Sequence, residues 1–334
     1  MSGPVNPPVA TLRDVARAAG VSTASASRAL AGEGSVSAEL HARIMAAAAR
    51  LGYQANLAAR ALVSGRSRLV GIVAETLADS LIAGVVEHLE RGLGAQSYGT
   101  LLATTAGSPV RSPAATGVLI GRGAEALVFA GTGPLRSEID LLAAHGLPWL
   151  EVSDAPGTAA MAIDTGRRQG GALAARYLLE LGHRRYGVVG RRGASIRLGV
   201  AATLEESGSG RLLPDTTTGG DDPDSIRSAM RALLDGDERP TAVVCGSDAE
   251  ALAAVRECSM RGFIVPDDIA VIGFGDEEFA RHAAPGLTTI RVSASAIGAH
   301  GAEMLLARLA GGLQQPFEGP VKLVVRHSTG PPSG

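Results

Sequence analysis

The first fifty residues carry apolar side chains at the spacing of short amphipathic helices. On one face of the first helix, these positions are Leu12, Val15, Ala16 and Ala19. Thr11 is a favourable N-cap, Asp14 is its capping-box partner, and Gly20 ends the helix. Further helices are predicted at 23–30 and 37–51. Two helices joined by so short a turn form a helix-turn-helix, whose second helix enters the major groove of DNA.

From Leu69 onward, short and continuously apolar runs alternate with longer helical stretches. The runs predicted to be strands lie at 69–74, 99–104, 126–131, 149–152, 186–190, 241–246, 269–275 and 321–325. The predicted helices lie at 78–96, 137–145, 169–181, 225–234 and 249–261, and polar loops lie at 105–117, 153–161 and 205–225. Apolar strands that alternate with helices form parallel sheets with helices on both faces. A stretch of this length predicts two doubly wound units.

Composition adds a charge asymmetry to this picture. The 334 residues carry a net charge of −2, but residues 1–67 carry +4, so that the remainder is negative by 6 charges. A basic DNA-binding segment attached to an acidic core would have this distribution of charge. The sequence shows neither a secretory signal nor a run of some 18 apolar residues, so we expect a cytoplasmic protein without a membrane partner. Cys245 and Cys258 lack metal-ligand spacing and are expected to be buried thiols.

The segment from Thr11 to Tyr53 resembles the DNA-binding headpiece of the LacI/GalR family of bacterial transcription regulators. The matching stretches are LRDVARAAGVS at 12–22, SRAL at 27–30, Val36-Ser37 and Leu51-Gly52-Tyr53. The next stretch, QANLAARALVSGRSRLVGIV at 54–73, resembles that family's hinge helix and its entry into the core. The resemblance implies that the hinge folds when two protomers sit on DNA and that Leu62 inserts into the minor groove. The alternative for Leu62 is a linker leucine that packs on the core.

Four core motifs follow in the order found in the same family. They are ELGHRR at 180–185, PTAVVCGSD at 240–248, VPDDIAVIGFGD at 265–276 and PGLTTIRV at 285–292. The resemblance implies an N-terminal all-α helix-turn-helix headpiece and an α/β, periplasmic-binding-protein-like core of two doubly wound parallel-sheet subdomains. The expected domains are a disordered tail (1–10), the headpiece (11–55), a hinge helix and linker (56–67), and the core (68–330). Its N-subdomain is expected at 68–162 plus 294–319, and its C-subdomain at 163–293 plus 320–328.

The side chains expected to meet DNA lie mainly on the second helix of the headpiece. They are Thr23, Ala24, Ser27 and Arg28. Arg28 suits a bidentate contact to guanine, Ala24 offers only apolar contact, for instance with a thymine methyl, and Thr23 can hydrogen-bond a base edge or a phosphate. The expected phosphate and hinge contacts are Thr11, Ser22, Ser37, Asn56, Ala59 and Leu62. For the serines, N-capping is the alternative, and both roles are compatible.

The cleft between two doubly wound units, at the carboxyl ends of the strands, is the natural place for a small ligand. The family resemblance implies an effector there, and we expect a sugar or sugar acid. The expected contacts are Asp79, Ser80, Arg197, Ser247, Asp248 and Asp276. Compared with the usual family pattern, Ser80, Gly275 and Val292 replace an aromatic residue, an aspartate and a polar ligand contact, and DTGRRQGG at 164–171 carries extra residues. The sequence therefore predicts a pocket of altered chemistry, which takes an unusual ligand or none.

Together these features indicate a transcriptional repressor. We expect it to bind a pseudo-palindromic operator as a homodimer and to respond to a small effector. No cofactor or metal is expected. A solute-binding protein of the periplasmic type would share the core, but the headpiece and the absence of a signal peptide argue against it. An enzyme is the third class, and the sequence offers no convergent acid, base or nucleophile to support it.

Overall fold

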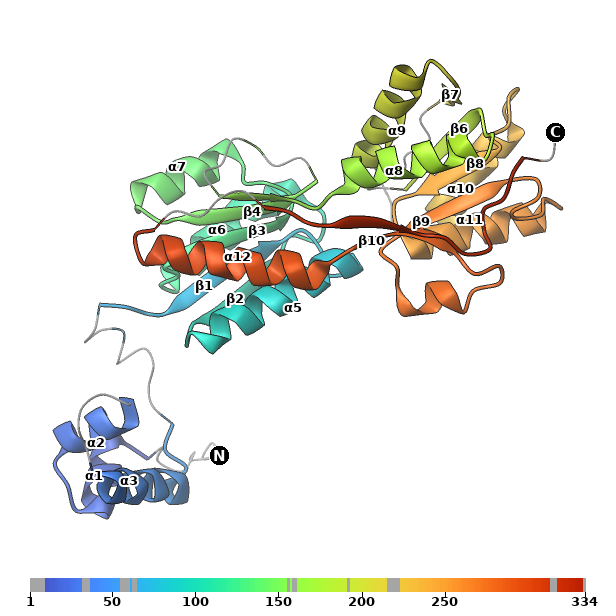
Figure 1. Cartoon of the computed structure of the whole chain (residues 1–334). Coiled ribbons are helices and arrows are strands. Elements are labelled where there is room, and N and C mark those ends of the chain that lie inside the picture. The colour runs from blue at the N-terminus through green and yellow to red at the C-terminus, as the bar shows by residue number, and fades with distance from the viewer. Residues whose placement is uncertain are drawn as a thin grey trace, which may run out of the picture. The chain divides into compact units, whose positions relative to one another are not determined.

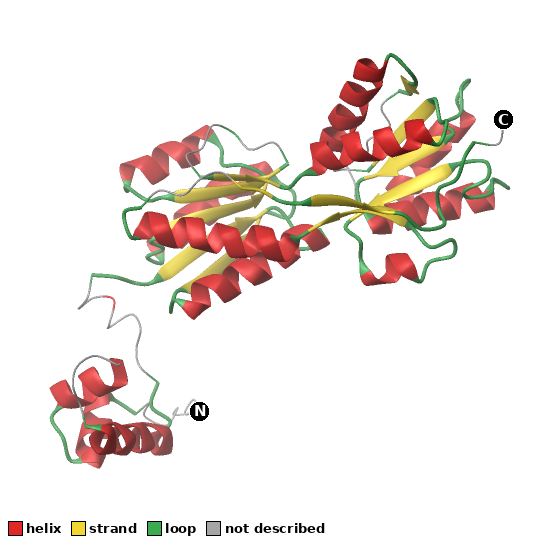
Figure 2. Cartoon of the chain, viewed as in Figure 1, coloured by secondary structure: helices red, strands yellow, loops and turns green. Residues whose placement is uncertain are grey.

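The computed structural model describes residues 10–31, 37–54, 61, 65–154, 157, 161–190, 193–214, 223–312 and 317–332. The chain divides into two compact units, a headpiece within residues 1–67 and a core within residues 68–334. The headpiece is all-helical in its described part, and the core combines helices with two sheets (Figures 1 and 2). Among the described residues, no helix has the length and apolar character that a membrane span needs.

The headpiece consists of α1 (Leu12–Ala19), α2 (Thr23–Ala31) and α3 (Ala38–Leu51). Both halves of the predicted capping box at Thr11 and Asp14 are present, and a left-handed Gly20 ends α1 with a φ of 64°. The small core of the headpiece contains Val15, Ala16, Ala19, Ala26, Ala29, Ile44, Ala47 and Ala48. The predicted helix-turn-helix is therefore confirmed.

The first sheet of the core has the strand order β11-β5-β4-β3-β1-β2, and all its pairings are parallel. Its strands are β1 (Leu69–Ala74), β2 (Gly99–Thr104), β3 (Ala126–Gly131), β4 (Trp149–Ser153), β5 (Ala162–Asp164) and β11 (Phe317–Glu318). The helices that cover it are α5 (Ser80–Ala95), α6 (Ser112–Gly121), α7 (Arg136–Ala144) and α12 (Ala294–Leu309), with the short η1 (Pro109–Arg111) before α6. Leu89 of α5 and Leu305 of α12 belong to the core on one face, and Leu119 of α6 and Leu142 of α7 belong to the core on the other. We call this layered unit the first lobe.

The second sheet has the order β12-β10-β9-β8-β6-β7, and only its edge strand β12 is antiparallel. Its strands are β6 (Arg185–Val189), β7 (Arg211–Leu212), β8 (Ala242–Cys245), β9 (Ala270–Phe274), β10 (Thr288–Val292) and β12 (Val321–Val324). Its helices are α8 (Arg167–Glu180), α9 (Gly193–Ser207), α10 (Pro223–Asp235) and α11 (Asp248–Met260), and the short η2 (Glu278–Arg281) follows β9. Leu178 of α8 and Val200 of α9 pack on one face, and Met230 of α10 and Ala254 of α11 pack on the other. We call this unit the second lobe.

The chain passes between the lobes three times. The first passage runs from β5 to α8, the second from β10 to α12, and the third from β11 to β12. Since β5 pairs in the first sheet as far as Asp164, the first passage follows that residue. The two lobes are therefore joined by three connections (Figure 1).

The predicted strands agree with the observed ones to within one or two residues, but several elements differ from the prediction. The loop predicted at 105–117 is wrong, because η1 and α6 begin within it. Pro113 lies in the first turn of α6, where a missing N–H costs nothing, so the Ser-Pro pair marks a helix start. Helices α9 and α12 and strands β5, β7, β10 and β11 were not predicted. In α9 and α12, small residues are spread round the helix and leave no clear apolar stripe.

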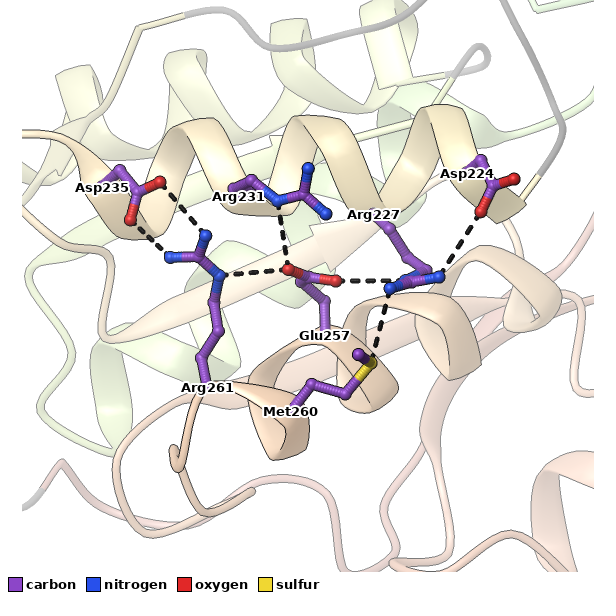
Figure 3. A network of polar contacts seen from close by, with 7 residues as sticks. All are labelled: Asp224, Arg227, Arg231, Asp235, Glu257, Met260 and Arg261. Carbon is purple, nitrogen blue, oxygen red and sulfur yellow. Dashed lines mark hydrogen bonds and ion pairs between the residues drawn. The ribbon is translucent and has the colours of Figure 1, made fainter.

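A buried carboxylate joins α10 to α11 in the second lobe (Figure 3). The side chain of Glu257 is only 4% exposed and accepts hydrogen bonds from Arg261 at 3.0 Å, Arg227 at 3.1 Å and Arg231 at 3.4 Å. Burial opposes the charge, but these hydrogen bonds outweigh it and hold the pKa of Glu257 below its ordinary value. Arg261 also pairs with Asp235 on α10. The network adds polar contacts to the apolar packing of these two helices.

Candidate functional site

One side of α2 is free of core contacts and carries the predicted base-reading residues. Ala26 and Ala29 are buried against α1 and α3, which fixes the orientation of the helix. The opposite side presents exposed side chains of Ser22, Thr23, Ala24, Ser27 and Arg28. A helix held by small alanines on one side and polar on the other has the shape that fits a major groove.

The other predicted headpiece contacts are helix caps. Thr11 caps α1 through its bond to Asp14, the Ser22 hydroxyl accepts from the Ser25 N–H at 3.1 Å, and the Ser37 hydroxyl accepts from the Leu40 N–H at 3.3 Å. All three capping side chains are exposed, so capping leaves room for a phosphate. The hinge residues Asn56, Ala59 and Leu62 lie outside the described residues. Their predicted roles stay predictions.

A pocket of about 140 Å³ lies between the lobes at the carboxyl ends of the strands. Three of the six predicted effector residues line it, namely Asp79, Ser80 and Ser247. Asp79 and Ser247 also cap α5 and α11, because their side chains accept from the first backbone N–H groups of those helices. Ligand pockets are usually about 300–1,000 Å³, so this cleft is nearly filled by its own side chains.

The other three predicted effector residues do not line this pocket. Asp248 lies fully buried beneath it, where it accepts hydrogen bonds from the Thr289 hydroxyl and the Glu277 N–H. Burial raises the pKa of Asp248, and these two hydrogen bonds only partly counter that effect. Arg197 on α9 donates to the carbonyl oxygen of Leu213 at 2.7 Å. These positions support the second lobe from within.

Asp276 forms ion pairs with Arg291 and Arg326 and is nearly buried. Burial alone would raise the pKa of Asp276, but the hydrogen bonds from Arg326 and Arg291 lower it below its ordinary value. Its φ of 55° places it in the left-handed region directly after Gly275. The two arginines thus hold the turn that follows β9.

The side chain that fills the cleft is Arg167, which the sequence analysis did not select. It is only 3% exposed, and its Nη2 atom lies 2.8 Å from Oδ2 of Asp79. Its Nε atom lies 3.1 Å from Oδ1 of Asp154, and its Nη1 donates to the carbonyl oxygen of Gly246 at 2.6 Å. Its guanidinium carbon lies 4.6 Å from the centre of the Phe274 ring. The only warning in the sequence was the enlarged DTGRRQGG segment, in which Arg167 lies.

A second bond across the cleft involves Glu277. The Ser80 hydroxyl of the first lobe donates to Oε1 of Glu277 in the second lobe at 2.7 Å. The backbone N–H of Glu277 in turn donates to buried Asp248 at 2.7 Å. The mouth of the pocket is therefore polar, and its acidic lining residues are Asp79, Glu250 and Glu277. Among the described residues, no His/Cys/Asp/Glu cluster has the arrangement of a metal site.

Both the headpiece and the core match families of known proteins. The model of bacterial regulatory proteins of the lacI family matches residues 11–56, and the periplasmic binding protein-like domain matches residues 175–329. The HTH-type transcriptional repressor PurR of Yersinia enterocolitica is 30% identical over 331 residues, which are 96% of this chain and 97% of that protein. PurR of Haemophilus influenzae is 27% identical over 307 residues, or 90% of this chain and 91% of that protein.

Solved structures agree with this result. The Lac repressor bound to ONPG in the repressed state has a TM-score of 0.82 at 25% identity and covers 96% of this chain and 100% of its own. The CelR–cellobiose complex has a TM-score of 0.68 at 27% identity and covers 96% and 99% of the two chains. The match favours a regulator over both a solute-binding protein and an enzyme. The chain belongs to the LacI/GalR family of DNA-binding bacterial transcription regulators.

Proposed function

We propose that this chain is a repressor that reads its operator through the exposed side of α2. The observation that carries the proposal is the set of exposed polar side chains on this helix, opposite buried Ala26 and Ala29. In this reading, Arg28 and Thr23 contact base edges, and Ser22 and Ser37 bind phosphates. Asn56 also contacts a phosphate, Ala59 adds a hinge contact to DNA, and Leu62 inserts into the minor groove.

We also propose that the repressor acts as a homodimer on a two-fold symmetric site in the cytoplasm. One headpiece covers only one half-site of DNA. A dimer covers two half-sites and can therefore recognise a longer, more specific sequence. Apolar side chains on the outer side of the first lobe support this pairing, because Leu102 on edge strand β2, Val110 on η1 and Val118 on α6 are all exposed. A second copy that covers them would remove this apolar surface from water.

The cleft is the proposed effector site of the same molecule. Its lining offers the Ser80 and Ser247 hydroxyls and several carboxylates, which accept hydrogen bonds from a small polar molecule. Arg167 is the one cation among its described lining residues, and Asp79 and Asp154 already engage it. A sugar acid is therefore disfavoured, because its carboxylate would face the acidic lining, whereas a sugar-like ligand without negative charge is compatible with this cleft.

Selection of bound duplexes from a random DNA library, at two salt concentrations, tests the operator proposal. A two-fold symmetric site is expected. A plot of the logarithm of the association constant against the logarithm of the salt concentration should have a slope of about −0.9 for each phosphate that the protein neutralises. The matched control is the chain with Arg28→Ala, which should lose preference at one base position in each half-site. Recovery of no preferred sequence by the wild-type chain would contradict the proposal. Sedimentation of the free protein tests the dimer.

A further inference from the structure

The position of Arg167 is unfavourable for the helix that carries it. Arg167 is the first residue of α8, directly after the left-handed Gly166, and the first turn of α8 contains no acidic residue. A cation at a helix N-terminus is repelled by the positive end of the helix dipole. Burial of a guanidinium also costs free energy unless it is paired and hydrogen-bonded. The contacts of Arg167 across the cleft must therefore offset both costs.

Those contacts surround the guanidinium with two carboxylates, a carbonyl oxygen and an aromatic ring, although its buried Nε atom has an ion-pair contact with Asp154 and no hydrogen bond to a described residue. Two carboxylates of the first lobe, Asp79 and Asp154, pair with its nitrogen atoms, and Thr165 donates a hydrogen bond that orients Asp154 at 2.6 Å. The second lobe supplies the carbonyl of Gly246 and the face of the Phe274 ring. Carboxylates at the edge and an aromatic face above are the groups that recognise organic cations.

The approach of Phe274 to this site depends on a glycine. A Cβ atom at Gly170 would come within 2.8 Å of the Phe274 ring, so a larger residue there would push the ring away. Gly170 lies one helical turn after Arg167 on α8, within the enlarged DTGRRQGG segment. The same short segment therefore supplies the cation and makes room for the ring that receives it.

We propose that Arg167 is a built-in occupant of the effector site that holds the two lobes together, and that the effector is a small organic cation that takes its place. This inference deepens the proposed function and rests on it. An amine or a guanidine, including an amino sugar, would replace the positive charge of Arg167 between Asp79 and Asp154. A neutral ligand of the same size would not replace the ion pairs that Arg167 makes with these two carboxylates, so a cation should bind better than its neutral isostere.

The proposal predicts that an external cation rescues a chain that lacks the internal one. In the full-length chain, Arg167→Ala should lower the thermal midpoint by several degrees, and methylguanidinium at millimolar concentration should restore it. Methylurea has the same shape without the charge and should not. Methylguanidinium should bind the variant on the order of tenfold more tightly than the wild type, in which Arg167 already fills the site.

Arg168→Ala is the matched control, because this neighbouring arginine of α8 is exposed and its side chain makes no hydrogen bond or ion pair with the described residues. Its thermal midpoint should equal that of the wild type and should not change when methylguanidinium is added. If Arg167→Ala does not fold, Arg167→Gln replaces it, since glutamine keeps part of the polar contact without the charge. Three results overturn the proposal: equal melting of the two alanine variants, equal rescue by methylurea, or no rescue at all. A failure to bind any operator would refute the proposed function and leave this thermal result intact.

Discussion

Replacing Glu257 by glutamine removes the buried charge that three arginines share between α10 and α11. Breaking a fully buried ion pair by changing one partner costs about 3–5 kcal/mol. Here the guanidiniums are partly hydrated, because Arg227 and Arg261 are each 28% exposed and Arg231 is 49% exposed. Solvent screening reduces the penalty, and we expect a loss of about 2 kcal/mol. For a unit of this size, that loss lowers the thermal midpoint by roughly 4–8 °C.

Calorimetry of the full-length chain at neutral pH measures this effect, and Glu87→Gln is its control. Glu87 forms an exposed pair with Arg91 at 2.8 Å within one helix, which is worth no more than about 0.5 kcal/mol. The core transition of Glu257→Gln should therefore fall well below that of the control. If the two variants melt together, the buried network does not stabilise the α10–α11 contact and the reasoning is refuted.

The same pair of proteins yields a pH test. Because the pKa of Glu257 is lower in the folded chain than in the unfolded chain, its charge stabilises the fold above the unfolded value of about 4.3. That contribution is lost as the pH falls through the folded pKa. The stability gap between the wild type and Glu257→Gln should therefore stay constant from neutral pH to about 5 and close only at lower pH. A gap that closes near pH 6 would point to a histidine instead.

Four further substitutions test the headpiece and the helix packing. Arg28→Ala should weaken operator binding by about 1–3 kcal/mol in a mobility-shift titration and relax the preference for one base, while the unfolding midpoints stay unchanged. Ile44→Ala should cost the headpiece about 2–5 kcal/mol, because Ile44 is fully buried in its small core, and circular dichroism should show that transition move alone. Gly199→Ala should destabilise the core by about 1–3 kcal/mol in urea, because its Cβ would overlap the carbonyl oxygen of Arg168 between α8 and α9. Gly117→Ala on α6, where a Cβ meets nothing within 4 Å, should instead stabilise the core by about 0.5–1 kcal/mol.

The headpiece was predictable because its determinants are local. The capping box at Thr11 and Asp14, the turn at Gly20 and the spacing of the alanines each depend on residues a few positions apart. The buried strands β1 and β3 were predictable for the same reason, since a short run of apolar residues between polar segments suffices. The predicted DNA-facing residues of α2, Thr23, Ala24, Ser27 and Arg28, are all exposed in the structure.

The cleft was less predictable because its contacts join distant parts of the chain. Arg167 pairs with Asp79, 88 positions away, and donates to Gly246, 79 positions away, so no local pattern marks it. Asp276 stands at the end of a strand, as a ligand contact would, but Arg326 from the far end of the chain engages it. Helix α12 was missed because its packing against α5 relies on glycines such as Gly298, which leave no apolar stripe.

The three passages between the lobes have a consequence for synthesis on the ribosome. The headpiece is contiguous and can fold as soon as residues 1–67 have emerged. The first lobe must wait for α12 and β11, which are made only after the whole sequence of α8 to β10. Until then, Val85 and Leu89 of α5 lack their cover and remain open to chaperones or to aggregation. A chain that stops before residue 294 would therefore have a folded headpiece attached to a core whose first lobe cannot fold completely.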